Sequence, residues 1–71
     1  MGDLVILTAS MRAKPGQEEE LGRRLHALIA PPRPEAGCVI YDLHRSTEDP
    51  AAWMFYEVWR TKADLEQHGR T

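Results

Sequence analysis

The sequence predicts a small α+β domain with an antiparallel sheet, in the order strand, helix, strand, strand, helix. Three observations support this fold class. Apolar residues recur at every second position in three segments, which is the period of a strand that lies over a core. Two other segments have helical spacing or a helix cap. The chain has 71 residues, which suits one domain with one small core.

The first strand is predicted at residues 4–13, because its odd positions are apolar while its even positions change from apolar to polar. Pro15 and Gly16 form a turn after it. A helix is then predicted at residues 17–30, with three glutamates in its first turn, where the helix dipole favours negative charge. Its apolar stripe consists of Leu21, Leu25, Leu28 and Ile29. The prolines that follow end the helix.

The second strand is predicted at residues 38–45 and the third at residues 52–60, with a turn-rich connector between them. Simple alternation places Cys38 on the side of Ile40 and away from Tyr41. The third strand is apolar on both faces, which indicates a central strand that is covered on both sides.

The second helix is predicted at about residues 62–68. Thr61 is a typical N-cap, Asp64 occupies the capping-box position, and Gly69 ends the helix. The order of elements is the ferredoxin-like βαββαβ pattern without its last strand. Both helices are expected on one face of the sheet.

The other face of the sheet is then left uncovered and partly apolar. Its apolar residues are Leu4, Ile6, Met54, Tyr56 and Val58. An apolar sheet face of this kind is typical of an association surface. The sequence therefore predicts a homodimer that packs two sheets face to face.

Composition argues against several classes of protein. The formal net charge is −2, from 9 basic and 11 acidic residues, which is too balanced for a nucleic-acid-binding domain. No apolar run approaches the roughly 20 residues of a membrane helix, so no membrane partner and a cytoplasmic location are expected. The single cysteine and three histidines lack ligand spacing, so neither a disulfide nor a metal site is predicted.

Four segments of the chain together resemble the antibiotic biosynthesis monooxygenase family of small quinol-monooxygenase-like proteins. They are Lys14-Pro15-Gly16-Gln17-Glu18-Glu19, Gly37-Cys38-x-x-Tyr41-Asp42-Leu43-His44-Arg45-Ser46-x-x-Asp49-Pro50, Tyr56-Glu57-Val58-Trp59 and Asp64-Leu65-x-x-His68. The resemblance implies one domain over residues 1–71 and a dimeric α+β barrel. Domains of this family continue into a fourth strand, which would follow Thr71, so the chain is expected to be naturally short or truncated there.

The resemblance also implies an activity. Characterised members oxidise quinol-like or phenolic substrates with O2 and use no flavin, haem or metal, because the substrate supplies the electrons. The expected partners are therefore a small aromatic substrate, O2 and a second copy of the chain.

Glu57 is the first candidate catalytic residue, because it lies between Phe55 and Trp59 on an aromatic strand face. A carboxylate there is costly to bury unless it is paired or hydrogen-bonded, and burial favours its protonated form. Such a group suits a general base for a phenol proton. The alternative is a structural hydrogen bond, to a histidine or to the backbone.

His68 is the second candidate catalytic residue, because imidazole titrates near neutral pH and an inward-facing His68 would meet Glu57 or Trp59. The alternative is an exposed residue at a fraying helix end. Tyr41 and Trp59 are the candidate substrate-binding residues, which would stack on a flat ring or, alternatively, serve as core aromatics.

Three functional hypotheses follow from these residues. The first is a cofactor-independent monooxygenase of a small quinol or phenol. The second is a non-catalytic dimeric barrel that binds a small aromatic or lipid-like ligand. The third is an inactive fragment of a longer domain.

Overall fold

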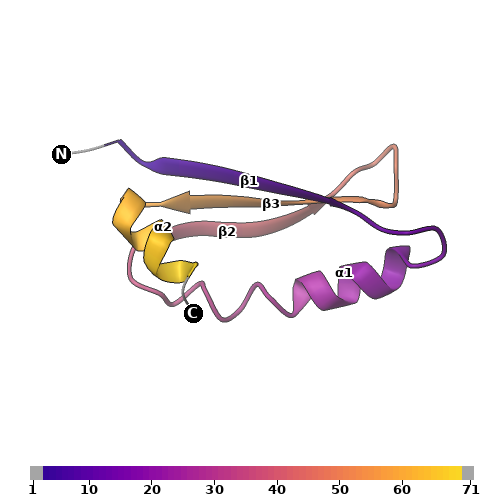
Figure 1. Ribbon diagram of the computed structural model, residues 1–71, viewed down its shortest axis with the longest axis horizontal. Coiled ribbons are helices and arrows are strands. Elements are labelled where there is room, and N and C mark those ends of the chain that lie inside the picture. Colours follow the sequence, from indigo (N-terminus) through magenta and orange to yellow (C-terminus); the bar gives the residue numbers. More distant parts are fainter. Residues whose placement is uncertain (1–2, 70–71) are drawn as a thin grey trace.

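The computed structural model describes residues 3–69, and these form a sheet with helices on one side (Figure 1). The strands are β1 (Val5–Arg12), β2 (Cys38–Arg45) and β3 (Ala52–Trp59), and the helices are α1 (Glu18–His26) and α2 (Lys62–His68). The sheet is antiparallel with the order β1-β3-β2. The predicted ferredoxin-like α+β fold is confirmed, and every strand lies within one residue of its expected bounds.

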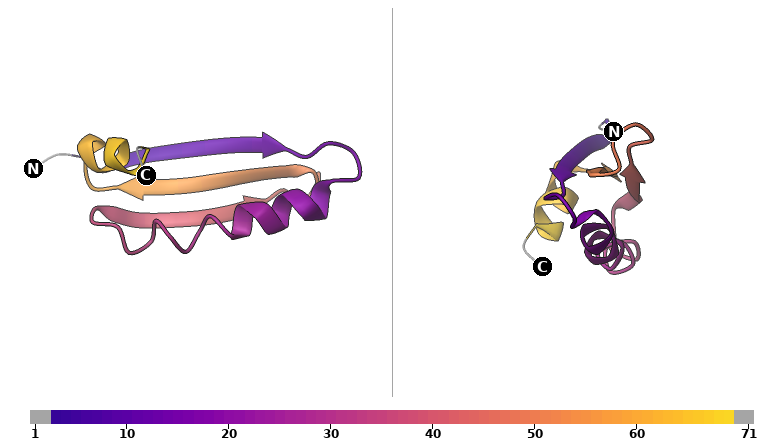
Figure 2. Two further views of the ribbon diagram at one scale, coloured as in Figure 1. Left: turned by 60° about the horizontal axis from the view of Figure 1, so that its bottom comes forward. Right: turned by 90° about the vertical axis from the view of Figure 1, so that its right-hand side faces the viewer.

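Both helices cover the same face of the sheet, as predicted (Figure 1, Figure 2). Helix α1 lies toward the β2–β3 hairpin, and α2 lies toward the opposite end of the strands. The buried side chains of this covered face are Leu25, Tyr41, Trp53, Phe55, Glu57 and Trp59. Within the described part of the chain, no helix has the length and apolar character needed to cross a membrane.

The opposite face, here called the open face, has no helix over it within residues 3–69 (Figure 2). Ile6 and Ile40 flank Val58 in the strand register and form an apolar row across the three strands. Ile6 is 60% exposed, whereas Val58 is 4% exposed because it lies on the central strand between the two isoleucines. Apolar side chains therefore face outward, as the sequence predicts.

The prediction of a first helix over residues 17–30 is wrong at its C-terminal end, because α1 ends at His26. Beyond that point the backbone tightens. The amide of Leu28 donates to Leu25, at 3.0 Å, and that of Ile29 donates to His26, at 3.2 Å, so each bond spans three residues instead of four. Leu28 is 53% exposed and does not belong to the buried stripe. The prolines downstream disfavour helical geometry in the residues before them.

The predicted side of Cys38 is also wrong, because β2 begins with a β-bulge. Cys38 pairs with Trp59 and Ile40 pairs with Val58, so Val39 is an extra residue between two partners. An extra residue moves the side chains that precede it to the opposite face of the sheet. Cys38 therefore packs against the core of the covered face and not on the side of Ile40.

A glycine allows α1 to approach the sheet closely. Gly22 is buried against the indole ring of Trp53, and a Cβ atom built on Gly22 would lie 2.4 Å from that ring. The guanidinium of Arg45 lies 4.6 Å from the centroid of the same ring. Trp53 is thereby held between a helix and a charged side chain of β2.

Helix α2 begins at its predicted cap. Thr61 Oγ1 accepts a hydrogen bond from the backbone N–H of Asp64 at 3.1 Å and donates one to Asp64 Oδ2 at 2.9 Å. The carboxyl group of Asp64 also packs on Gly37, which has a φ of +87°. The backbone N–H of Arg60 donates to the carbonyl of Gly37 at 2.8 Å. The segment that leads into β2 is therefore fixed to the first turn of α2.

Candidate functional site

The structure brings the four predicted site residues together at the α2 end of the covered face. Tyr41 is paired with Glu57 across β2 and β3, and Trp59 follows two residues later on β3. His68 comes from α2, and its ring lies over Trp59, with 4.9 Å between the ring centroids and 31° between the planes. Tyr41 meets His68 at 5.5 Å and Trp59 at 6.4 Å, both edge to face. Three rings thus form one cluster beside a carboxyl group.

Glu57 is the buried charged group of this cluster, with an exposed fraction of 4%. Its Oε1 accepts a hydrogen bond of 3.0 Å from Trp59 Nε1. This bond offsets part of the cost of burying the carboxyl group. The partner is the indole N–H, whereas the sequence suggested a histidine or the backbone for a structural bond.

Tyr41 is buried beside this carboxyl group, and its pKa is raised above its usual value of 10.0, first by burial and then by the negative charge of Glu57. Its hydroxyl therefore stays protonated at neutral pH and can act as a hydrogen-bond donor.

Cys38 lies on the same face of the sheet, and its pKa is raised like that of Tyr41. Burial, followed by the nearby carboxylates of Glu35 and Glu57, raises the pKa of its thiol above 9.0. A protonated thiol is a poor nucleophile. Cys38 is therefore a packing residue.

Glu35 is a site residue that sequence reasoning missed. His68 Nδ1 lies 3.3 Å and 3.4 Å from the two carboxylate oxygens of Glu35. Glu35 belongs to the loop between α1 and β2, where no apolar period marks any side chain. The sequence places it only on the path into β2, and its proximity to a histidine 33 residues away is visible only in the folded chain.

A hollow of about 430 Å³ opens between this loop and the ring cluster. It is lined by Leu28, Pro31, Pro32, Glu35, Tyr41 and His68. Its volume lies within the range of small-molecule sites, roughly 300–1,000 Å³. Tyr41 and His68 line the hollow, whereas Glu57 and Trp59 are not among the lining residues. An apolar wall with three polar groups suits a flat ring that carries a hydroxyl group.

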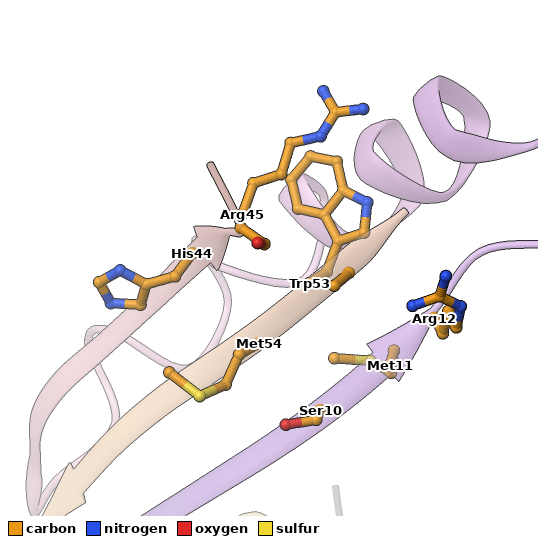
Figure 3. Close-up of a pocket in the computed structure, with 9 residues that line it drawn as sticks. Ser10, Met11, Arg12, His44, Arg45, Trp53 and Met54 are labelled. Atoms are coloured by element: carbon orange, nitrogen blue, oxygen red, sulfur yellow. The ribbon is translucent and has the colours of Figure 1, made fainter. Parts of the chain in front are cut away.

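A second hollow of about 460 Å³ lies at the hairpin end of the sheet, away from the ring cluster. There Ser10, Met54 and His44 lie side by side on the three strands (Figure 3). The same view shows Arg45 beside the ring of Trp53 (Figure 3). None of the four predicted site residues lines this hollow, and neither does a carboxyl group. We therefore assign the candidate site to the α2 end.

Within residues 3–69, no three His, Cys, Asp or Glu side chains come together in a group that could hold a metal ion.

The sequence and fold are similar to those of known proteins. A family model described as "Antibiotic biosynthesis monooxygenase" matches residues 4–71. "Uncharacterized protein sll1783" of Synechocystis is 30% identical over 69 residues, which are 97% of this chain and 47% of that protein. "Putative monooxygenase YcnE" of Bacillus subtilis is 26% identical over 96% of this chain and 72% of its own length. The chain thus spans about half of the first relative and nearly three quarters of the second.

The fold is also similar to that of a crystal structure. PA3566 from Pseudomonas aeruginosa is 47% identical and superposes with a TM-score of 0.88, covering 96% of this chain and 68% of that one.

Proposed function

Because this chain belongs to the antibiotic biosynthesis monooxygenase family, we propose that it oxidises a small quinol or phenol with O2 and without a bound cofactor. The observation that carries this proposal is the cluster of Tyr41, Trp59 and His68 beside the buried carboxyl group of Glu57. The cluster combines flat apolar surfaces with groups that can move a proton, and it borders a hollow of suitable size.

The chemistry needs little from the protein beyond binding and proton transfer. Loss of a hydroxyl proton makes a quinol electron-rich enough to reduce O2 itself. One oxygen atom then enters the ring and the other leaves as water, so hydroquinone and O2 give hydroxybenzoquinone and water. The substrate supplies all the electrons, and the protein supplies a base and an enclosed, apolar surface.

The proposed roles follow from position. His68 lines the hollow and takes the hydroxyl proton. Glu57 lies at the indole N–H edge of Trp59, the ring on which His68 stacks, and its negative charge stabilises the imidazolium that forms. Tyr41, held protonated by its raised pKa, donates a hydrogen bond to the phenolate oxygen. Tyr41 contacts the substrate ring. Trp59 is fully buried and does not line the hollow, so it supports the ring of His68 and not the substrate.

We further propose a homodimer through the open face. The apolar row of Ile6, Val58 and Ile40 supports it, because its two outer residues are exposed and monomers rarely leave a large apolar patch in water. Ile6→Glu is expected to shift the mass measured by light scattering from dimer to monomer. A monomeric parent chain would contradict the dimer.

The alternative is a binding module without turnover. One observation favours the binding module. The carboxyl group of Glu57 is hydrogen-bonded to Trp59 and does not line the hollow. A module of this kind holds an aromatic ligand on Tyr41 and His68 and leaves it unchanged.

Oxygen uptake with a panel of hydroquinones, in chelator-treated protein, separates the two functions. The enzyme proposal expects uptake that falls at least tenfold in Glu57→Gln, which keeps the acceptor for Trp59 Nε1 but loses the charge. Glu66→Gln, an exposed position on α2, is the matched control and is expected to match the parent chain. Melting shifts with these quinols and no uptake would favour the binding module. Equal uptake by Glu57→Gln would refute the role of Glu57.

A further inference from the structure

We propose that Glu35 is a positioning residue that fixes the tautomer of His68 and thereby directs its Nε2 to the substrate hydroxyl. The inference rests on the proposed function for its catalytic meaning, because His68 is the proton acceptor there. Its structural content, the tautomer, can be measured without any substrate. The tautomer assignment and the proposed function can therefore be refuted separately.

The geometry of the pair sets the tautomer. Nδ1 of His68 is almost equally far from both oxygens of Glu35, at 3.3 Å and 3.4 Å. An ionised carboxylate only accepts hydrogen bonds, and a neutral imidazole carries one N–H. The proton of the neutral ring therefore belongs on Nδ1, which leaves the lone pair on Nε2.

The plane of the imidazole is set by different neighbours. The ring of His68 stacks on Trp59, with 4.9 Å between the centroids, and meets Tyr41 edge to face at 5.5 Å. These contacts limit the tilt of the ring, but they do not distinguish one nitrogen from the other. Glu35 supplies that distinction, so the ring contacts and the carboxylate constrain His68 in different ways.

Glu35 is itself held in place by its loop. Its backbone N–H donates to Pro32 at 2.9 Å, and its carbonyl accepts from the N–H of Cys38 at 3.1 Å. Arg33, two residues before it, donates to the carbonyl of Tyr41 at 3.2 Å and to Asp42 at 3.1 Å. The side chains of Glu35 and His68 are 29% and 24% exposed, so water screens this pair less than a surface pair.

The chemical consequence is a stabilised imidazolium. When the substrate hydroxyl gives its proton to Nε2, the O–H bond breaks, an N–H bond forms, and the ring becomes positive with both nitrogens as donors. The carboxylate of Glu35 then faces that charge directly, and the carboxyl group of Glu57 lies at the indole N–H edge of Trp59, the ring on which His68 stacks. Tyr41, whose ring contacts that of His68, stays neutral at neutral pH.

The pair could instead serve only to link the loop to α2, and substitutions distinguish these roles. Glu35→Gln keeps an oxygen acceptor for Nδ1 but removes the charge. Glu35→Ala removes both the acceptor and the charge. Glu35→Asp keeps both but shortens the side chain by one methylene, which moves the carboxylate away from Nδ1. Glu66→Ala is the matched control, because Glu66 is an exposed residue of α2.

The test is nitrogen NMR of the full chain with 15N-labelled histidine, at a pH where the imidazole is neutral. We expect His68 to be an Nδ1–H tautomer in the parent chain, in Glu66→Ala and in Glu35→Gln. In Glu35→Ala and Glu35→Asp we expect a shift toward Nε2–H. An Nε2–H ring in the parent chain, or an unchanged tautomer in both of these variants, would overturn the proposal. If Glu35→Ala does not fold, the tautomer of His68 in Glu35→Asp alone tests the proposal.

Kinetics with hydroquinone provide the second measurement. We expect Glu35→Ala to lower kcat at least tenfold with little change in KM, and Glu35→Gln to fall between Glu35→Ala and the parent chain. A folded Glu35→Ala with the parent kcat would overturn the positioning role. A parent chain that takes up no O2 but shows the expected tautomers would refute the proposed function and leave the tautomer control by Glu35 supported.

Discussion

Replacing Gly37 with alanine should destabilise the protein more than the same replacement at Gly16. The two glycines have similar left-handed backbones, with φ of +87° and +82°. A Cβ atom on Gly16 would meet nothing within 4 Å, whereas one on Gly37 would lie 2.3 Å from the carboxyl group of Asp64. Gly16→Ala therefore measures the backbone cost alone, and Gly37→Ala adds a collision with the first turn of α2.

The magnitudes can be worked out from these contacts. A left-handed alanine costs about 1–2 kcal/mol at either position. At Gly37 the carboxyl group of Asp64 must also move, which disturbs its hydrogen bond with Thr61 Oγ1, and losing one hydrogen bond costs about 1 kcal/mol. We therefore expect the free energy of unfolding to fall by about 1–2 kcal/mol in Gly16→Ala and by about 2–3 kcal/mol in Gly37→Ala.

Urea unfolding followed by circular dichroism measures both variants, provided that the slope m is unchanged. Hydrogen exchange adds a local readout, because only Gly37→Ala should increase exchange of the α2 amides. Equal losses of stability in the two variants, or unchanged exchange in α2, would show that the contact between Gly37 and Asp64 does not support the helix.

Three further predictions concern the ring cluster and its surroundings. Trp59→Phe removes the indole donor to buried Glu57 and should lower the free energy of unfolding by about 1–3 kcal/mol in urea titrations; a loss below about 0.5 kcal/mol would contradict the importance of that bond. Because the native pKa of Tyr41 is raised above 10.0, its stabilising contribution is complete below pH 10 and is lost as the pH rises through the native value. Tyr41→Phe should make that alkaline loss less steep in urea titrations at several pH values, and an identical slope would refute the assignment. The raised pKa of Cys38 should make its alkylation by iodoacetamide at neutral pH slower in the native chain than in urea, as followed by mass spectrometry; equal rates would contradict its protected state.

The strand part of the site could be predicted because it depends on a local period. Glu57 and Trp59 are two residues apart on one strand, so they must share a face wherever that strand lies. The apolar residues around them also identify β3 as the central strand, which places both beneath the covering helices. The burial of this carboxyl group therefore follows from the sequence alone.

Two local predictions failed because the backbone departs from its ideal period. The bulge at Val39 adds one residue, and one residue is enough to bring Cys38 to the covered face. The spacing of Leu28 and Ile29 continues the helical pattern, although the hydrogen bonds have already tightened to three-residue steps. The spacing of apolar residues in the sequence reveals neither the bulge nor the tightened backbone after α1.

Glu35 could not be found from the sequence for a different reason. It lies in a proline-rich loop, where no period assigns a face, and its partner His68 is 33 residues away in the chain. The pair depends on the docking of α2 and on the path of the loop, both of which are tertiary features. The part of the site that combines a helix with a loop therefore required the structure.

The two tryptophans give the chain a separate optical reporter for each helix. Trp53 lies against Gly22 of α1, and Trp59 lies against His68 of α2. They are six residues apart on β3, which is about 20 Å along an extended strand. Single Trp→Phe chains would therefore emit from one end of the sheet at a time. Quenching by an aromatic ligand could then be assigned to the α2 end or to the hairpin end without any added label.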